Sequence, residues 1–152
     1  MVSSAPRPED TPLIRVSSRV VIGGLLWALV YNCVWALAWF TFMRREWLDS
    51  TAALRKSMPW TEIWVVSGAL TLPLGVATVA YVAGRARTGP APRAALAAGL
   101  ALWVPMTMGM SGWGWYESLS LRTLMLDSTV NLLAIGAAVL AAVRLHGRLT
   151  TV

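Results

Sequence analysis

The chain has 152 residues, of which 57% are hydrophobic and only 13% are charged, and its formal net charge is +6. Charged residues make up about a quarter of a typical soluble domain, so this composition excludes an ordinary soluble protein. The excess of arginine does not indicate nucleic-acid binding, because long apolar stretches separate the cations. Composition therefore predicts an integral membrane protein with membrane lipids as its immediate partners.

The first 18 residues are rich in serine, proline and charge, and they contain too little apolar surface to fold. We expect them to form a disordered tail. An apolar run without any charge then extends from Arg19 to Arg44. The sequence Ala36-Leu37-Ala38 resembles a signal-peptide cleavage site. The run is longer than a signal peptide requires and stays apolar beyond that site, so we predict a retained first span.

Four apolar runs in all are long enough to cross a hydrocarbon core, which takes roughly 20 helical residues. The predicted spans cover about residues 20–43, 62–84, 94–115 and 121–143. Between the charges that bound them, only the fourth run contains a charged residue, Asp127. We predict an all-α integral membrane protein with one domain, residues 19–144, in which four transmembrane helices form a compact up-down bundle with short loops. Residues 145–152 follow as a short basic tail.

Large aromatic residues recur at intervals of four along the first span, namely Trp27, Tyr31, Trp35 and Trp39. Trp and Tyr are favoured at membrane interfaces, so one interpretation is that they face lipid and anchor the helix. The alternative is a face that binds a protein partner, a second copy of the chain, a quinone or a lipid, because most of these residues lie too deep for an interfacial belt. The sequence leaves both interpretations open.

Small and weakly polar residues recur at spacings of three and four in three of the spans. They are Gly24, Ala28, Asn32 and Ala36 in the first span, Gly68, Thr71, Gly75 and Thr78 in the second, and Asp127, Asn131, Ala134, Ala138 and Ala141 in the fourth. Small residues let transmembrane backbones approach closely, and hydrogen bonds across such seams contribute on the order of 0.6–2 kcal/mol each. We therefore expect these faces to pack tightly inside the bundle.

Asp127 is the strongest candidate functional residue, because an ionisable group within a span is costly and generally has a function. Asn131 lies one helical turn further along on the same face. The sequence therefore predicts a polar pocket around Asp127, formed by Asp127, Asn131, Glu62, Glu117, Arg122 and Asn32. The alternative interpretation is structural: Asp127 either caps the fourth helix or pairs with Arg122 as an anchor.

The distribution of positive charge predicts the orientation of the bundle. Eight arginines fall on the side of the membrane that carries both termini, against four arginines and one lysine on the opposite side. Loops rich in arginine and lysine remain in the cytoplasm, so we predict that both termini are cytoplasmic. Heavy use of arginine and alanine suggests a bacterium with a GC-rich genome, and hence the bacterial plasma membrane.

The residue types needed to hold a cofactor or metal are almost absent from the sequence. The single cysteine, Cys33, and the single histidine, His146, exclude a C-x-x-C redox pair and a bis-histidine haem within one chain. The sequence also lacks the E-R-x-x-x-N helix motif of the membrane enzymes called MAPEG and the span-one glutamate of small multidrug transporters. We therefore predict no cofactor and no metal site.

Three functions are compatible with these features. The leading hypothesis is a noncatalytic accessory subunit or scaffold of a membrane complex, for which packing faces and aromatic surfaces suffice. The first alternative is a small transporter or proton-linked channel, with Asp127 as the titrating group and helix kinks at Pro73 and Pro105 as moving parts. The second is a lipid-modifying enzyme that uses Glu62, Glu117 and Asp127 for acid–base chemistry.

Overall fold

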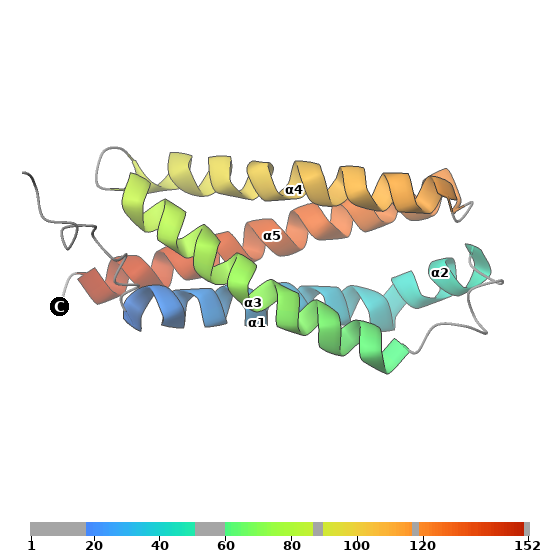
Figure 1. The fold of residues 1–152 in the computed structure, drawn as a ribbon, viewed down its shortest axis with the longest axis horizontal. Helices are drawn as coiled ribbons and strands as arrows, with labels where there is room; N and C mark the ends of the chain where they lie inside the picture. The colour runs from blue at the N-terminus through green and yellow to red at the C-terminus, as the bar shows by residue number, and fades with distance from the viewer. Residues whose placement is uncertain (1–17, 51–59, 87–89, 117–118, 151–152) are drawn as a thin grey trace, which may run out of the picture.

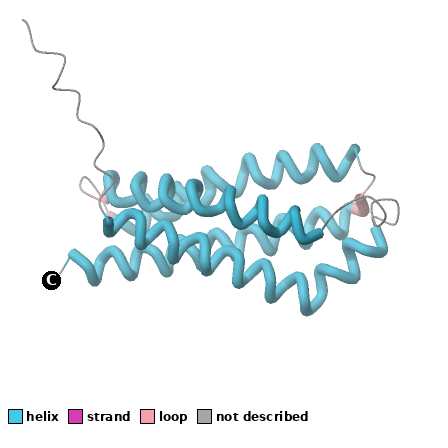
Figure 2. The backbone as a smooth tube through the Cα atoms, turned by 60° about the horizontal axis from the view of Figure 1, so that its bottom comes forward, coloured by secondary structure: helices cyan, strands magenta, loops and turns pink. Residues whose placement is uncertain are grey.

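The computed structural model describes residues 18–50, 60–86, 90–116 and 119–150, and these residues are helical almost throughout. The elements are α1 (Ser18–Ala38), the π-helical turn η2 (Trp39–Met43), α2 (Arg44–Ser50), α3 (Trp60–Arg85), α4 (Ala91–Tyr116) and α5 (Leu121–Thr150). The long helices run along one another, and α1 begins at the end of the molecule where α5 finishes (Figure 1, Figure 2). The predicted all-α up-down bundle is confirmed. The predicted N-terminal tail before Ser18 lies outside the described residues.

Four helical stretches are long and apolar enough to cross a membrane, namely Ser18–Asp49, Val65–Arg85, Ala91–Gly112 and Leu121–Leu145. Large apolar side chains on all of them are more than half exposed, including Leu29, Phe40, Val65, Leu96 and Leu133. A surface of this kind is unfavourable in water and suits lipid tails. The protein is therefore membrane-embedded, as its composition predicts. The helices extend beyond the predicted spans, because α2 continues the first to Ser50 and α5 reaches Thr150.

The π-helical turn η2 keeps the interior face of the first span continuous. Ala38, Met43 and Trp47 are all buried, so one interval between buried positions is five residues instead of three or four. The backbone N–H of Arg44 donates to the carbonyl of Trp39, five residues earlier, which is the hydrogen bond of a π turn. In an uninterrupted α-helix, Phe42 would follow Ala38 by four residues and point inward. The π turn instead leaves Phe42 exposed and brings Met43 inside.

Helices α1 and α3 cross with their backbones in contact at two glycines. A Cβ atom at Gly75 would lie 2.6 Å from the carbonyl oxygen of Gly24, and a Cβ atom at Gly24 would lie 2.7 Å from the backbone of Val76. No side chain larger than hydrogen fits at such a crossing, so these positions require glycine. Gly24 and Gly75 belong to the small-residue faces expected from the sequence.

Helix α5 packs between α1 and α4 and contributes more buried residues to the central core than any other helix. Ala134, Ile135 and Ala138 are almost completely buried and cluster with Trp27 and Tyr31 of α1. Close packing along small side chains is the main source of helix association within a membrane. The buried faces of α1 and α5 therefore hold these two helices together over most of their length.

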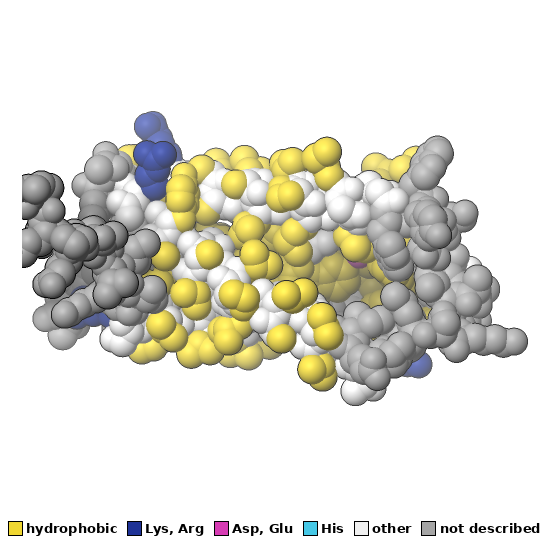
Figure 3. Space-filling model, viewed as in Figure 1, with side chains coloured by type: hydrophobic (Ala, Val, Ile, Leu, Met, Phe, Trp, Pro, Cys, Tyr) yellow, Lys and Arg dark blue, Asp and Glu magenta, His cyan; other side chains and the backbone are white. Residues whose placement is uncertain are grey.

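Helices α3 and α4 approach each other near their connection and diverge toward their other ends (Figure 1). Near the connection, Val82 of α3 packs against Ala94 and Ala98 of α4. Further along, a Cβ atom at Gly68 of α3 or Gly109 of α4 would meet nothing within 4 Å. Figure 3 shows a hollow between the two helices in this region, with hydrophobic side chains around it. Both Pro73 and Pro105 lie within continuous helices.

Candidate functional site

Asp127 and Asn131 of α5 form the centre of a buried hydrogen-bond network with two aromatic residues of α1. The side-chain amide of Asn131 donates to Asp127 Oδ2 over 3.1 Å. Its carbonyl oxygen accepts from the Tyr31 hydroxyl at 2.7 Å and from the indole N–H of Trp35 at 3.1 Å. Asp127 and Asn131 are 1% and 2% exposed, and Tyr31 is 4% exposed. We call these four residues the Asp127 network.

The network is satisfied everywhere except at one carboxylate oxygen. Within the described residues, Asp127 Oδ1 is fully buried and has no hydrogen-bond partner. An ionised carboxylate has about four lone-pair positions, and Asn131 supplies a single donor to them. A buried carboxylate with an unpartnered oxygen is unfavourable in a membrane interior. The site therefore has unused capacity to bind a proton or a hydrogen-bond donor at Oδ1.

The residues around Asp127 offer donors more than acceptors. Asn131 Oδ1 already accepts two hydrogen bonds, and the groups that reach it from α1 are a hydroxyl and an indole N–H. Trp27, which stacks on Tyr31 with ring centroids 5.2 Å apart, has a second buried indole N–H. Within the described residues, no group of three or more His, Cys, Asp or Glu side chains comes together as metal ligands do. Hydrogen-bond donors of this kind stabilise an ionised carboxylate, whereas a metal cation needs several oxygen ligands.

Other hydrogen bonds between helices lie outside the Asp127 network. Asn32 of α1 donates to Thr71 of α3 at 2.9 Å and to the carbonyl of Ala28 at 2.8 Å. The indole N–H of Trp103 on α4 donates to the carbonyl of Ser128 on α5 at 2.9 Å. The predicted pocket included Asn32, but the structure pairs its side chain with Thr71 of α3 and not with Asp127 or Asn131. The Asn32–Thr71 bond links α1 to α3 and the Trp103–Ser128 bond links α4 to α5, while the Asn32–Ala28 bond lies within α1.

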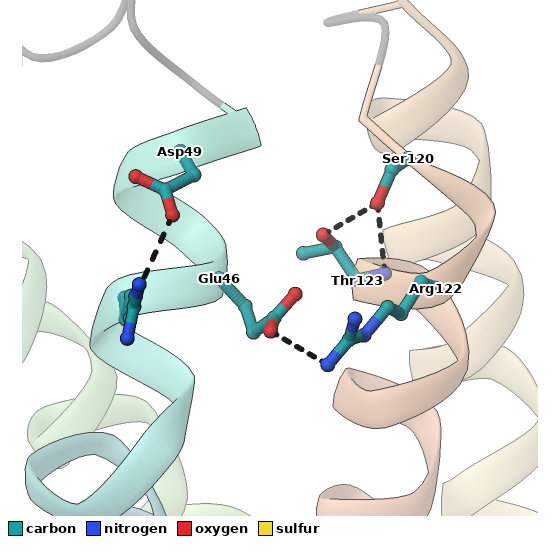
Figure 4. A network of polar contacts seen from close by, with 6 residues as sticks. Glu46, Asp49, Ser120, Arg122 and Thr123 are labelled. Carbon is teal, nitrogen blue, oxygen red and sulfur yellow. Dashed lines mark hydrogen bonds and ion pairs between the residues drawn. The ribbon is translucent and has the colours of Figure 1, made fainter.

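The structural interpretation of Asp127 was wrong in both of its forms. Helix α5 is capped by Ser120, whose hydroxyl oxygen accepts from the backbone N–H of Thr123 at 3.1 Å (Figure 4). Arg122 forms an ion pair with Glu46 of α2 at 2.9 Å, as Figure 4 shows. Asp127 lies about 9 Å along the helix from Leu121, well inside it. Asp127 therefore neither caps α5 nor pairs with Arg122.

The remaining acids of the predicted pocket cannot be placed in it. Glu117 lies outside the described residues, and Glu62 belongs to α3 but its side chain is outside the described part. The sequence reasoning also missed Glu46, which ties α2 to the start of α5 through Arg122. Of the six predicted pocket residues, the structure brings together Asp127 and Asn131.

The aromatic face predicted on the first span needs correction. Trp27 and Tyr31 are buried inside the bundle, and Trp35 and Trp39 are partly buried. Trp27 packs at the glycine crossing, where its ring lies 3.0 Å from the Cβ position of Gly75. Trp27 and Tyr31 therefore do not face lipid or a partner, whereas Trp35 and Trp39 keep part of their surface accessible. Tyr31 and Trp35 instead belong to the Asp127 network, and their four-residue spacing places both on the face of α1 that meets Asn131.

No protein-family model matches the chain, and searches of curated proteins and of solved structures found no match.

Proposed function

We propose that this protein is a small proton-linked membrane transporter or channel in which Asp127 binds and releases the proton. The observation that carries the proposal is the buried Asp127 Oδ1, which has no hydrogen-bond partner within the described residues while Oδ2 is held by Asn131. Ionisable groups inside membrane spans commonly serve proton relays and ion pathways. A proton is the one ligand small enough to reach an oxygen with almost no accessible surface.

The Asp127 network provides a route by which protonation affects the helices. An ionised Asp127 accepts the hydrogen bond from Asn131, whereas a protonated one carries an O–H donor that requires an acceptor. Asn131 is also the residue to which Tyr31 and Trp35 bind α1 to α5. A rearrangement of Asn131 would therefore alter the α1–α5 contact. This coupling between a proton site and helix packing is what a transport cycle requires.

The orientation and location follow from the charge distribution. We infer that both termini are cytoplasmic, since eight of the thirteen lysines and arginines fall on the side that carries the termini. The composition suggests the bacterial plasma membrane. With this orientation, the Asp127 end of α5 lies toward the outer face of the membrane. Such a small bundle leaves enough exposed apolar surface to bind a second copy of the chain or another membrane protein.

The proposal is tested by proton flux into proteoliposomes that contain the purified protein, a trapped pH indicator and an imposed potassium diffusion potential. Wild-type protein should acidify the lumen when the potential is negative inside and alkalinise it when the potential is positive inside. Asp127→Asn should abolish this flux. Asp49→Asn is the matched control, because it removes an exposed carboxylate at the end of α2. Equal flux through wild type and Asp127→Asn would refute the proposal.

A noncatalytic accessory subunit is the second candidate, and the hollow between α3 and α4 favours it (Figure 3). Gly68 and Gly109 have open space at their Cβ positions, and small residues of this kind admit a neighbouring transmembrane helix. Native mass spectrometry after gentle extraction tests for a bound subunit. Gly109→Trp should release such a subunit, whereas Gly84→Trp, at an open position near the other end of α3, should retain it.

A further inference from the structure

A depression of about 450 Å³ lies on the exposed side of the first span, at the π turn. Its lining residues are Trp39, Phe40, Thr41, Phe42, Arg44, Arg45, Leu48 and Asp49. The depression joins two chemically different surfaces, because it begins among exposed aromatic side chains and ends at two adjacent arginines. It lies on the outer surface of the bundle and is separate from the buried Asp127 network.

The π turn creates this combination of side chains. Phe40 is 76% exposed and Phe42 is 46% exposed, so both aromatic rings project outward immediately before the arginines. The interior positions on either side are taken by Ala38 and Met43. π turns within α-helices are frequently found at functional sites. Here the extra residue turns an aromatic pair toward the lipid beside a cationic pair.

The arginines mark the level at which the helix leaves the apolar region. Arg44 is the first charged residue after Arg19, and both Arg44 and Arg45 are exposed. Guanidinium groups match phosphate oxygens in a bidentate geometry, and arginines near a membrane surface attract anionic lipids. We propose that this depression binds an anionic phospholipid, with the headgroup phosphate at Arg44 and Arg45 and an acyl chain along Phe40 and Phe42.

The nearby acids leave the arginines able to bind phosphate. Glu46 pairs with Arg122 of α5 at 2.9 Å. The contact between Arg45 and Asp49 measures 4.0 Å, and both side chains are largely exposed, so water screens it strongly. Within the described part of the chain, no ion pair involves Arg44. A phosphate would therefore bind the guanidinium of Arg44 without displacing an ion-pair partner among the described residues. At Arg45 it would compete only with the long, solvent-screened contact to Asp49.

The test is lipid binding by the full chain, followed by native mass spectrometry as phosphatidylglycerol is titrated into detergent-purified protein. We expect one tightly bound lipid for wild type, and an affinity about twenty-five-fold lower for Arg44→Gln/Arg45→Gln, from about a fivefold loss for each arginine. Arg19→Gln/Arg93→Gln is the matched control, because it removes two exposed arginines elsewhere and should leave the affinity unchanged. Circular dichroism establishes that each variant retains its helical content.

Two results would overturn the proposal. The first is equal phosphatidylglycerol affinity in wild type and in the Arg44/Arg45 variant. The second is displacement of the bound lipid by inorganic phosphate or glycerol phosphate at the same concentration as the lipid, which would assign the site to a soluble phosphate. A further arm replaces Phe40 and Phe42 by serine; reduced lipid affinity with unchanged phosphate affinity supports the acyl-chain contact, and unchanged lipid affinity contradicts it.

Discussion

Asn131 donates a hydrogen bond to Asp127 Oδ2 over 3.1 Å, one helical turn along α5, while it accepts from two aromatic side chains of α1. A single amide therefore links the membrane-embedded carboxylate to the packing of two helices. The stripe that contains both residues continues into Ala134 and Ala138, which are completely buried. The candidate proton site is consequently part of the main α1–α5 interface.

Replacing Asp127 by asparagine should leave the protein at least as stable as wild type. The amide has nearly the same volume as the carboxylate, and it removes the cost of holding an ionisable group inside the membrane. Thermal unfolding in detergent micelles, with Asp49→Asn as the exposed control, measures the change. A large loss of stability in Asp127→Asn would mean that the carboxylate is needed to hold the bundle together, and it would contradict a primarily functional role.

Asn131→Leu should destabilise the bundle by about 1–3 kcal/mol. The substitution keeps the side-chain volume but leaves the Tyr31 hydroxyl and the Trp35 indole N–H buried without their acceptor. Thr129→Val is the matched control, because the Thr129 hydroxyl donates to the carbonyl of Met125 within its own helix and is exposed. Reversible unfolding in mixed micelles gives both free energies. Equal values for the two variants would argue against the network as a link between helices.

Gly75→Ala should destabilise the α1–α3 crossing by roughly 1–3 kcal/mol, because the new methyl group would meet the Gly24 carbonyl oxygen at 2.6 Å. Gly68→Ala lies on the same helix but meets nothing within 4 Å. It should be neutral or stabilising by up to about 1 kcal/mol through helix propensity. The two variants differ by a single methyl each, so unfolding measurements on both isolate the crossing. A stable Gly75→Ala variant would disprove the close backbone contact.

Deletion of Thr41 should convert η2 into an α-helical turn without changing the direction of α2, because Met43 would then follow Ala38 by four residues, the interval that places two side chains on one face of an α-helix. Met43 and Trp47 should stay in the interior, and Glu46 should stay beside Arg122. The readout is a short thiol crosslinker between Glu46→Cys and Arg122→Cys in a Cys33→Ala background. The deletion should retain crosslinking, whereas insertion of one alanine after Thr41, which lengthens the interval to six residues, should suppress it by rotating α2 by about 100°. Loss of crosslinking after the deletion would contradict the account of η2 as one extra residue that keeps the interior face continuous.

The spans could be predicted from the sequence because each is a long apolar run, nearly free of charge, of the length that a membrane crossing requires. The sequence also predicted that Asp127 and Asn131 share a face, since residues four positions apart lie on the same side of an α-helix. Whether the side chains of Trp27 and Tyr31 face lipid or the interior of the bundle could not be predicted. Both environments are apolar, so hydropathy does not distinguish them. Only the position of Asn131 on another helix explains why Tyr31 and Trp35 turn inward.

The partner of Arg122 was equally inaccessible to sequence reasoning. Arg122 and Glu46 lie far apart in the chain, and their contact depends on the direction that the π turn gives to α2. The π turn itself arises from tertiary packing, because Ala38 and Met43 must both face the interior. No local propensity in the segment Trp39–Met43 predicts it. The five-residue interval between buried positions is recognisable once the interior is known.

The most direct test of the central claim is infrared difference spectroscopy of the protein in lipid bilayers, recorded as the pH of the bathing solution is changed. We expect a protonated-carboxyl stretching band that appears on acidification, is lost in Asp127→Asn and persists in Asp49→Asn. A shift of this band in Asn131→Leu would show that the proton is bound within the Asp127 network. A spectrum in which Asp127→Asn is identical to wild type across the pH range would contradict the claim that Asp127 binds the proton.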